Sequence, residues 1–228
     1  MKDLHGRAIR DYYQEKSRGP LLLHTSYHEV EEMPVEVFFR DEEDMSVIEH
    51  LALIECRGKT LDLGAGAGAH SLVLQSRGFD VNALDNSPGC IEVMKQSGVK
   101  NVIDQDYRNH TTKYDTILLL MNGLGLAGKR EHVPSFLQKC KTMLNPDGQI
   151  LVDSSDISYL YEDGTITKPS DYPGNIRYQY EYNGEKGDWF DWVYLDKCSL
   201  EEDVIQLGMS FELLTEDEND QYLALISI

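Results

Sequence analysis

The chain has 228 residues, enough for one large domain with a core of its own. Hydrophobic residues make up 41% and charged residues 27%, which excludes collagen, a coiled coil and wholesale disorder. The 40 acidic residues outnumber the 21 Lys and Arg residues, so the formal net charge is −19. Such a surface repels phosphate groups, and nucleic acids and anionic membranes are therefore discounted as partners.

Targeting and redox signals are missing from the sequence. The N-terminal residues lack the apolar stretch of a signal peptide, and the longest apolar run, 117–121, is too short to span a bilayer. None of the four cysteines has the spacing of a zinc or redox motif: Cys56, Cys90, Cys140 and Cys198. We therefore expect a cytoplasmic protein without a bound metal.

The first part of the chain, residues 1–40, is expected to form an N-terminal cap. Residues 4–17 predict a short helix that Gly19-Pro20 breaks, and irregular or extended chain follows. Residues 41–56 predict a helix, because acids lead the first turn and apolar residues recur at helical spacing.

Strands and helices then alternate up to residue 153. The predicted strands are 60–63, 79–84, 101–105, 115–121 and 149–152. The predicted helices are 69–75, 88–98 (capped by Ser87, with Pro88 in its first turn) and 131–144. This alternation predicts a parallel sheet with helices on both faces, and residues 41–153 would be the cofactor-binding core of a single domain.

The alternation stops after residue 153. Residues 176–182 alternate apolar and polar side chains, and a turn at 183–187 joins them to an aromatic strand at 188–195, so 154–198 is expected to be an inserted β-hairpin with a leading loop. Residues 199–228 are expected to form a helix capped by Ser199 and two antiparallel strands, 211–214 and 222–228.

The segment that carries chemistry is a glycine loop after the strand at 60–63. Gly64 and Gly66 allow a tight turn and a close approach to a ligand. Asp85 follows Gly64 by 21 residues and ends the next strand, where a carboxylate accepts hydrogen bonds from a ribose diol.

Two ligands compete for this loop. Gly64, Gly66 and Ala69 also satisfy the dinucleotide pattern, which would make the protein an NAD(P)-linked oxidoreductase. Asp62 lies two residues before the first glycine, where it would repel a pyrophosphate and attract a cation. S-adenosylmethionine brings an ammonium and a sulfonium group, and Asp62 therefore favours it.

Five motifs together resemble the class I S-adenosylmethionine-dependent methyltransferases: 62–68, 83–88, 105–107, 114–121 and 144–149. The resemblance covers residues 40–153 and the terminal strand pair. It implies an α/β fold with a Rossmann-like doubly wound sheet, mostly parallel with an antiparallel C-terminal strand, plus the inserted β-hairpin.

The resemblance also implies a set of cofactor-binding residues. The glycines would pack under the methionine and ribose, Asp62 would face the ammonium, and Asp85 would hold the ribose hydroxyls. The remaining acids and aromatics would surround the adenine, and the pair after the fourth strand would lie where the methyl group points. The set is Asp62, Gly64, Ala65, Gly66, Asp85, Asn86, Asp106, Tyr107, Met121 and Asn122.

The resemblance stops at the superfamily. Residues 121–126 lack the Asn/Asp-Pro-Pro-aromatic motif that methylates amino groups of bases, and the chain has no Pro-Cys nucleophile. The expected activity is therefore methyl transfer to a small molecule. A non-catalytic S-adenosylmethionine-binding protein is the second alternative.

Candidates for substrate contact come from outside the motifs. Residues 159–194 hold seven of the 13 tyrosines and both tryptophans, Trp189 and Trp192. They could form a substrate-covering flap, or pack on the domain or on a second subunit. Arg40 is the one cation in the acidic stretch 29–44, and it could pair with the methionine carboxylate of the cofactor or with nearby acids. Asn122 could bind substrate or satisfy its own loop.

No catalytic base can be assigned from the sequence. Methyl transfer needs little beyond positioning, which can supply about 7–11 kcal/mol. A base is required only when the attacking group carries a proton, and the candidates are His24, His28, His70 and the tyrosines.

Overall fold

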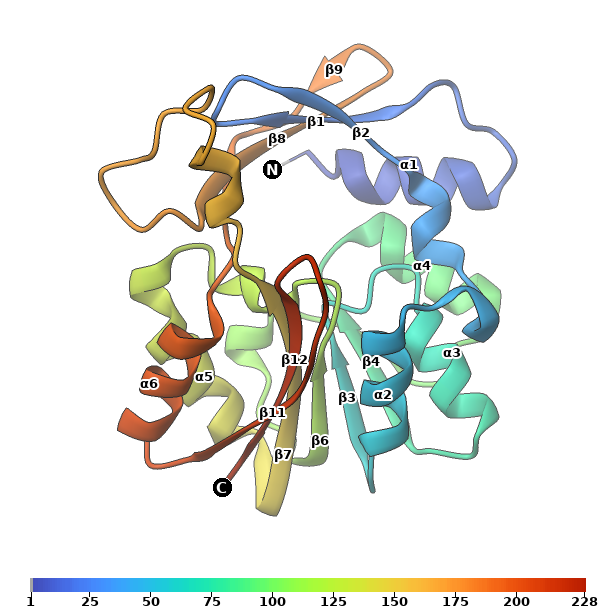
Figure 1. The fold of residues 1–228 in the computed structure, drawn as a ribbon. Helices are drawn as coiled ribbons and strands as arrows, with labels where there is room; N and C mark the ends of the chain where they lie inside the picture. The colour runs from blue at the N-terminus through green and yellow to red at the C-terminus, as the bar shows by residue number, and fades with distance from the viewer. Residues whose placement is uncertain (1) are drawn as a thin grey trace. The chain divides into compact units, whose positions relative to one another are not determined.

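The computed structural model describes residues 2–228, which fold as two compact units. The first contains the residues up to Met45, Leu61–His110 and Arg177–Phe190. The second contains Ser46–Thr60, Thr111–Ile176 and Asp191–Ile228. Figure 1 shows the ribbon with its element labels.

In the first unit, helix α1 packs against a small antiparallel sheet (Figure 1). The register pairs Leu21 with Met33 on one side and with Tyr182 on the other, and α1 contributes Leu4 and Ala8 to the shared core. The elements are α1 (Leu4–Tyr13), β1 (Leu21–Thr25), β2 (Val30–Met33), β8 (Asn175–Tyr182) and β9 (Glu185–Lys186). The extended chain expected after α1 forms the strands β1 and β2, and β1 also pairs with β8, which is far away in the sequence.

The same helix also packs against the glycine loop and helix α4. Ile9 of α1 shares a cluster with Ala67 and Cys90. Gly89 touches α1 so closely that a Cβ there would lie 2.1 Å from the carbonyl oxygen of Gly6. Here only glycine permits the two helices to cross at this distance.

The parallel part of the first unit follows the sequence prediction. Its strands run in the order β3-β4-β5, and β4 pairs with β5 in parallel, with Asp85 opposite Asp104. Ser87 accepts the N–H of Cys90 and so caps α4 as predicted. The elements are η1 (Val35–Phe39), η2 (Glu42–Asp44), β3 (Thr60–Leu63), α3 (Ala69–Ser76), β4 (Val81–Asp85), α4 (Pro88–Ser97), β5 (Val102–Asp104) and η3 (Tyr107–Asn109).

The second unit begins with helix α2 (Val47–Glu55). The prediction that this helix starts at residue 41 was wrong. A capping box formed by Ser46 and Glu49 fixes the start, and the acids before it form the separate turn η2.

The strands of the second unit run in the order β11-β12-β7-β6. β6 is parallel to β7, whereas β12 is antiparallel to both β7 and β11, which confirms the antiparallel terminal pair. Asp196, not Ser199 as expected, caps α6. The elements are β6 (Tyr114–Leu119), η4 (Gly123–Ala127), η5 (Arg130–His132), α5 (Val133–Thr142), β7 (Leu144–Ser155), η6 (Ser158–Tyr161), β10 (Phe190–Val193), α6 (Lys197–Gln206), β11 (Ser210–Glu216) and β12 (Gln221–Ser227).

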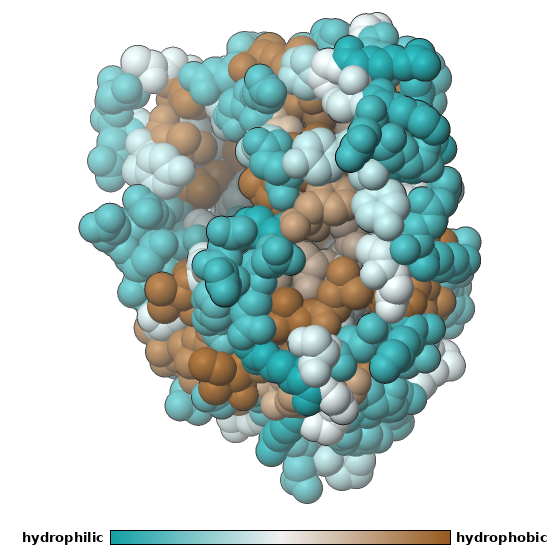
Figure 2. All heavy atoms as spheres, turned by 90° about the vertical axis from the view of Figure 1, so that its right-hand side faces the viewer, coloured by the Kyte–Doolittle hydropathy of each residue, from teal (hydrophilic) through white to brown (hydrophobic). Residues whose placement is uncertain are grey.

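These elements form an α/β Rossmann-like fold with a mixed sheet, as predicted. None of the helices between residues 2 and 228 is long and apolar enough to cross a bilayer. Figure 2 shows apolar atoms reaching the surface among polar ones, and Val47 and Ile54 of α2 are exposed apolar residues of this kind.

Candidate functional site

The glycine loop after β3 is tied to the end of β4. The N–H groups of Gly64 and Ala65 both donate to the Leu84 carbonyl, at 2.9 and 3.1 Å. Gly64 and Gly66 have φ angles of 79° and 57°, in the left-handed region that favours glycine. The loop thus keeps a fixed shape, with backbone and no side chain facing outward at both positions.

Asp85 holds the loops after β3 and β4 together. Its Oδ2 accepts the N–H of Gly66 at 2.9 Å, and its Oδ1 accepts the N–H groups of Asn86 and Ser87 at 2.7 and 2.8 Å. A carboxylate offers about four lone-pair sites, so this arrangement leaves one for a ligand hydroxyl. The half-buried Asp85 therefore fits its predicted role with ribose.

Asp62 is a buried carboxylate directly before the loop, with 3% of its surface exposed. Ser71 Oγ of α3 donates to its Oδ2 at 2.7 Å. Burial raises the pKa of Asp62, whereas the His70 charge and the Ser71 hydrogen bond lower it. A buried charge of this kind is costly unless a cation balances it, which fits a ligand ammonium.

The predicted adenine residues lie together with an arginine that the sequence reasoning missed. Arg108 donates to Asp106 Oδ2 at 2.9 Å, and its guanidinium lies 5.0 Å from the centroid of the Tyr107 ring. The Arg108 side chain is 67% exposed, so it can move aside for a ligand. Its position next to Asp106 and Tyr107 in the sequence was the available signal.

In the second unit, Met121 and Asn122 follow β6 in a strained backbone. Both have left-handed φ angles, 58° and 57°, which are uncommon outside glycine. The Asn122 N–H donates to Asp153 Oδ1 at 2.8 Å, while its own Oδ1 is buried without a partner among residues 2–228. Strain and an orphaned acceptor together are typical of a ligand site.

The two predicted tryptophans have different surroundings. Trp192 packs on the turn η4 that Asn122 begins, because a Cβ on Gly125 would lie 2.0 Å from the indole. Trp189 is 40% exposed and has the Arg177 guanidinium 5.6 Å from its ring. The geometry thus links Trp192, rather than Trp189, to the Asn122 turn.

The other predicted polar residues serve local contacts. Arg40 Nε donates to the Val37 carbonyl at 2.9 Å, and a role with the cofactor carboxylate stays a prediction. Among the candidate bases, His24 contacts Glu181 at 2.7 Å, His28 is exposed and His70 is buried near Asp62.

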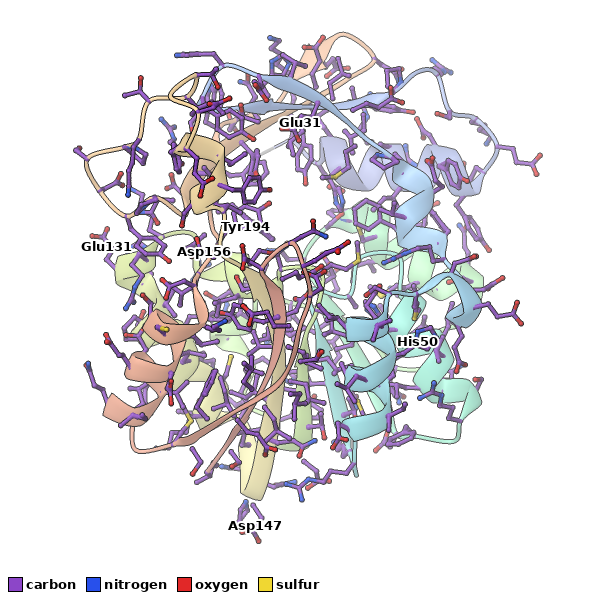
Figure 3. The ribbon with its side chains drawn as sticks, viewed as in Figure 1. Glu31, His50, Glu131, Asp147, Asp156 and Tyr194 are labelled. Carbon is purple, nitrogen blue, oxygen red and sulfur yellow. The ribbon has the colours of Figure 1, made fainter. Side chains whose placement is uncertain are left out.

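A cavity of about 160 Å³ lies within the second unit. Asp156 and Tyr194, labelled in Figure 3, line it together with Tyr172 and Asp196. Tyr172 donates to Asp196 Oδ2 at 2.7 Å, and Asp196 also caps α6. Asp196 therefore has a structural role. No cluster of metal-ligating side chains exists among the residues that the structure describes.

The fold, the glycine loop and the acid at the end of β4 define a class I S-adenosylmethionine-dependent methyltransferase. The chain belongs to the family described as "Tellurite resistance protein TehB", whose model matches residues 36–196.

Solved structures agree with this class. The chain is similar, over 100% of its length and 95% of the other chain, to an S-adenosylmethionine-dependent methyltransferase from Bacteroides fragilis in complex with S-adenosyl-L-homocysteine, at 39% identity and a TM-score of 0.92. S-adenosylmethionine is therefore the cofactor. An amino pentose methyltransferase from Micromonospora echinaspora shares the fold, with 13% identity over 88% of this chain and 99% of that one, and a TM-score of 0.56.

Curated relatives match a shorter stretch. A ubiquinone biosynthesis O-methyltransferase from Actinobacillus pleuropneumoniae serotype 5b (strain L20) is 30% identical over 106 residues, 40% of this chain. The matched stretch spans 42% of that relative's length.

Proposed function

We propose that the protein catalyses methyl transfer from S-adenosylmethionine to a small-molecule acceptor that carries an O–H or N–H group. The observation that carries this proposal is the Asp85 carboxylate, which holds the glycine loop through Gly66 and keeps a lone pair for a ribose hydroxyl. The cofactor would supply a methyl group already activated on a sulfonium.

The residues of the first unit would bind and orient the cofactor. Asp62 would hold the ammonium group, and Gly64, Ala65 and Gly66 would present backbone to the methionine and ribose. Asp85 and Asn86 would contact the ribose and the adenine edge, with Asp106 and Tyr107 beside the adenine. Each role keeps the reacting carbon in place and excludes water from it, which is the main requirement for this displacement.

Asn122 would contact a ligand through its side-chain amide. Its Oδ1 is a buried acceptor, and an unpaired buried acceptor costs about 1–3 kcal/mol. A donor from the acceptor or the cofactor would remove that cost. Asn122→Ala should then slow methyl transfer, while Asn122→Asp, which keeps an acceptor, should retain more of the activity.

The charge of the chain bears on the acceptor. The family's description refers to tellurite resistance, and tellurite is an oxyanion. A net charge of −19 disfavours binding of an anion, whereas it does not oppose a neutral or cationic acceptor. The relatives named as an O-methyltransferase and as an amino pentose methyltransferase are compatible with hydroxyl or amino acceptors.

We include a cytoplasmic location in this proposal. All four cysteines of the chain are free thiols, and Cys56, Cys90 and Cys140 are buried. Unpaired cysteines are typical of proteins in reducing compartments.

The test is transfer of a labelled methyl group from S-adenosylmethionine to a panel of neutral hydroxyl compounds, amines and tellurite. We expect S-adenosylhomocysteine as product with a neutral or cationic acceptor. Cofactor binding without transfer to any acceptor class would instead support the non-catalytic alternative.

A further inference from the structure

Five aromatic side chains of the first unit form a continuous row. The His5 ring meets the Phe38 ring edge-on at 4.9 Å and stacks on Tyr180 at 5.3 Å. Phe190 continues the row, 5.0 Å from Tyr180 and 6.0 Å from Tyr178. We call Phe38, His5, Tyr180, Phe190 and Tyr178 the aromatic row.

The row starts at the cofactor loop. Phe38 Cδ1 lies 3.7 Å from the position that a Cβ on Gly66 would take, so its ring borders the glycine loop. Phe38, His5, Tyr180 and Phe190 are each only half-buried, and each therefore keeps ring surface that a ligand can contact. Aromatic rings that are partly open beside a cofactor loop can bind a flat ring by stacking.

His5 is the member of the row that can accept a proton near neutral pH. It lies in the first turn of α1, with Nδ1 3.9 Å from Cys90 Sγ. The charges of Asp85 and Asp3 act on it, while its aromatic neighbours from η1 and β8 are uncharged. Burial lowers the pKa of His5, and the two aspartates oppose this effect. A neutral imidazole is the form that a general base requires.

We propose that the aromatic row is the acceptor-binding wall, that the acceptor is a small phenol-like compound, and that His5 removes its hydroxyl proton. This rests on the proposed function. Stacking favours a flat ring, and an aromatic hydroxyl needs a base before it attacks. A lone pair of the phenolic oxygen forms the new O–C bond, while the C–S bond breaks and leaves its electron pair on sulfur. The proton passes to His5 and then to water.

The binding test uses phenol and cyclohexanol as a matched pair, titrated into protein saturated with S-adenosylhomocysteine. Ligand-observed NMR should show that phenol binds about threefold to tenfold more tightly than cyclohexanol, which is the gain expected from aromatic contacts. Tyr180→Leu should abolish this preference, and Tyr180→Phe should keep it. The His5 ring resonances should shift with phenol. Equal affinities, or unchanged His5 resonances, would overturn the proposal.

The kinetic test follows methyl transfer to phenol as a function of pH. The wild-type kcat/KM should fall as pH decreases through the pKa of His5. His5→Gln should lower kcat about a hundredfold, the usual contribution of a general base, and should lose this acidic limb. His50→Gln, which changes a half-buried histidine of α2 outside the aromatic row (labelled in Figure 3), is the control and should match wild type.

The outcomes separate the two levels of the proposal. The proposed function itself is contradicted if S-adenosylhomocysteine does not bind, or if no acceptor class receives a methyl group. Transfer to another acceptor but not to phenol, or a His5→Gln variant with the wild-type pH profile, contradicts only the assignment of the row and of His5. Circular dichroism and the melting temperature confirm that each variant is folded.

Discussion

At the scale of single residues, the buried carboxylate of Asp62 lowers the stability of the folded protein when it is ionised. Because burial raises its pKa above the ordinary value of 3.8, the ionised form destabilises the folded state. That cost is absent below pH 3.8 and is fully present above the folded-state pKa. A binding role for the charge would explain why a carboxylate occupies this position.

We predict that Asp62→Asn raises the melting temperature at neutral pH while it weakens the binding of S-adenosylhomocysteine about tenfold or more. The amide keeps the shape and can still accept from Ser71 Oγ. The gain in melting temperature should shrink as the pH is lowered toward 3.8, where Asp62 becomes protonated. Calorimetry and thermal melts check both parts. Unchanged affinity would leave Asp62 a structural residue only.

Gly66 gives a second prediction at this scale. A Cβ would find space, since its nearest neighbour is Phe38 at 3.7 Å, but a φ of 57° is strained for alanine. Gly66→Ala should cost about 1–2 kcal/mol of stability and also weaken the binding of S-adenosylhomocysteine, because the loop must shift. Gly78→Ala is the control, with a φ of 88° and open surroundings. It should show the same loss of stability without loss of affinity.

At the scale of elements, α1 and α4 share one capping side chain. Asp3 accepts the Gly6 N–H of its own helix at 3.0 Å and the Gly89 N–H of α4 at 2.9 Å. It also accepts from Ser87 Oγ, and the Ser87 N–H donates to Asp85. Hydrogen bonds through Ser87 thus link the start of α1 to Asp85, the residue proposed to bind the ribose.

We therefore predict that Asp3→Ala lowers stability by about 1–2 kcal/mol, the usual cost of a lost cap, and also weakens the binding of S-adenosylhomocysteine. The matched control is Ser46→Ala, which removes the cap of α2. It should lose similar stability and keep the wild-type dissociation constant. Equal dissociation constants for the two variants would limit Asp3 to capping.

The sequence predicted those elements that local signals determine. The alternating strands and helices between 60 and 155 carry their own glycine, proline and capping residues, and the structure confirms them. β1 and β2 have no alternating pattern, and β1 pairs with β8 across a long sequence separation. The start of α2 was wrong because the acids of η2 resemble a first helical turn.

The candidate site also contains one part that the sequence predicts and one part that only the fold brings together. The glycine loop and Asp85 follow two successive strands that neighbour each other in the sheet, so their proximity could be predicted. His5 could not be found in this way, because its neighbours Phe38, Cys90 and Tyr180 come from three separate segments that only the fold brings together. The orphaned Oδ1 of Asn122 likewise depends on burial, which the sequence pattern does not contain.

At the scale of the whole molecule, family, fold and charge lead to one account. The family model, the similarity to an S-adenosyl-L-homocysteine complex and the buried Asp62 all indicate a ligand with a cationic methionine part. The net charge of −19 supports the proposal that the acceptor is neutral or cationic. The central claim is that the loop and Asp85 bind this cofactor.

Isothermal titration calorimetry with S-adenosylhomocysteine tests that claim most directly. We predict a dissociation constant of about micromolar order for the wild type, near −8 kcal/mol, and no measurable binding of NAD. Asp85→Ala should weaken the binding of S-adenosylhomocysteine by about 1–3 kcal/mol, since the ribose hydroxyls lose their acceptor. Heat from NAD and none from S-adenosylhomocysteine, or an Asp85→Ala variant with wild-type affinity, would contradict the account.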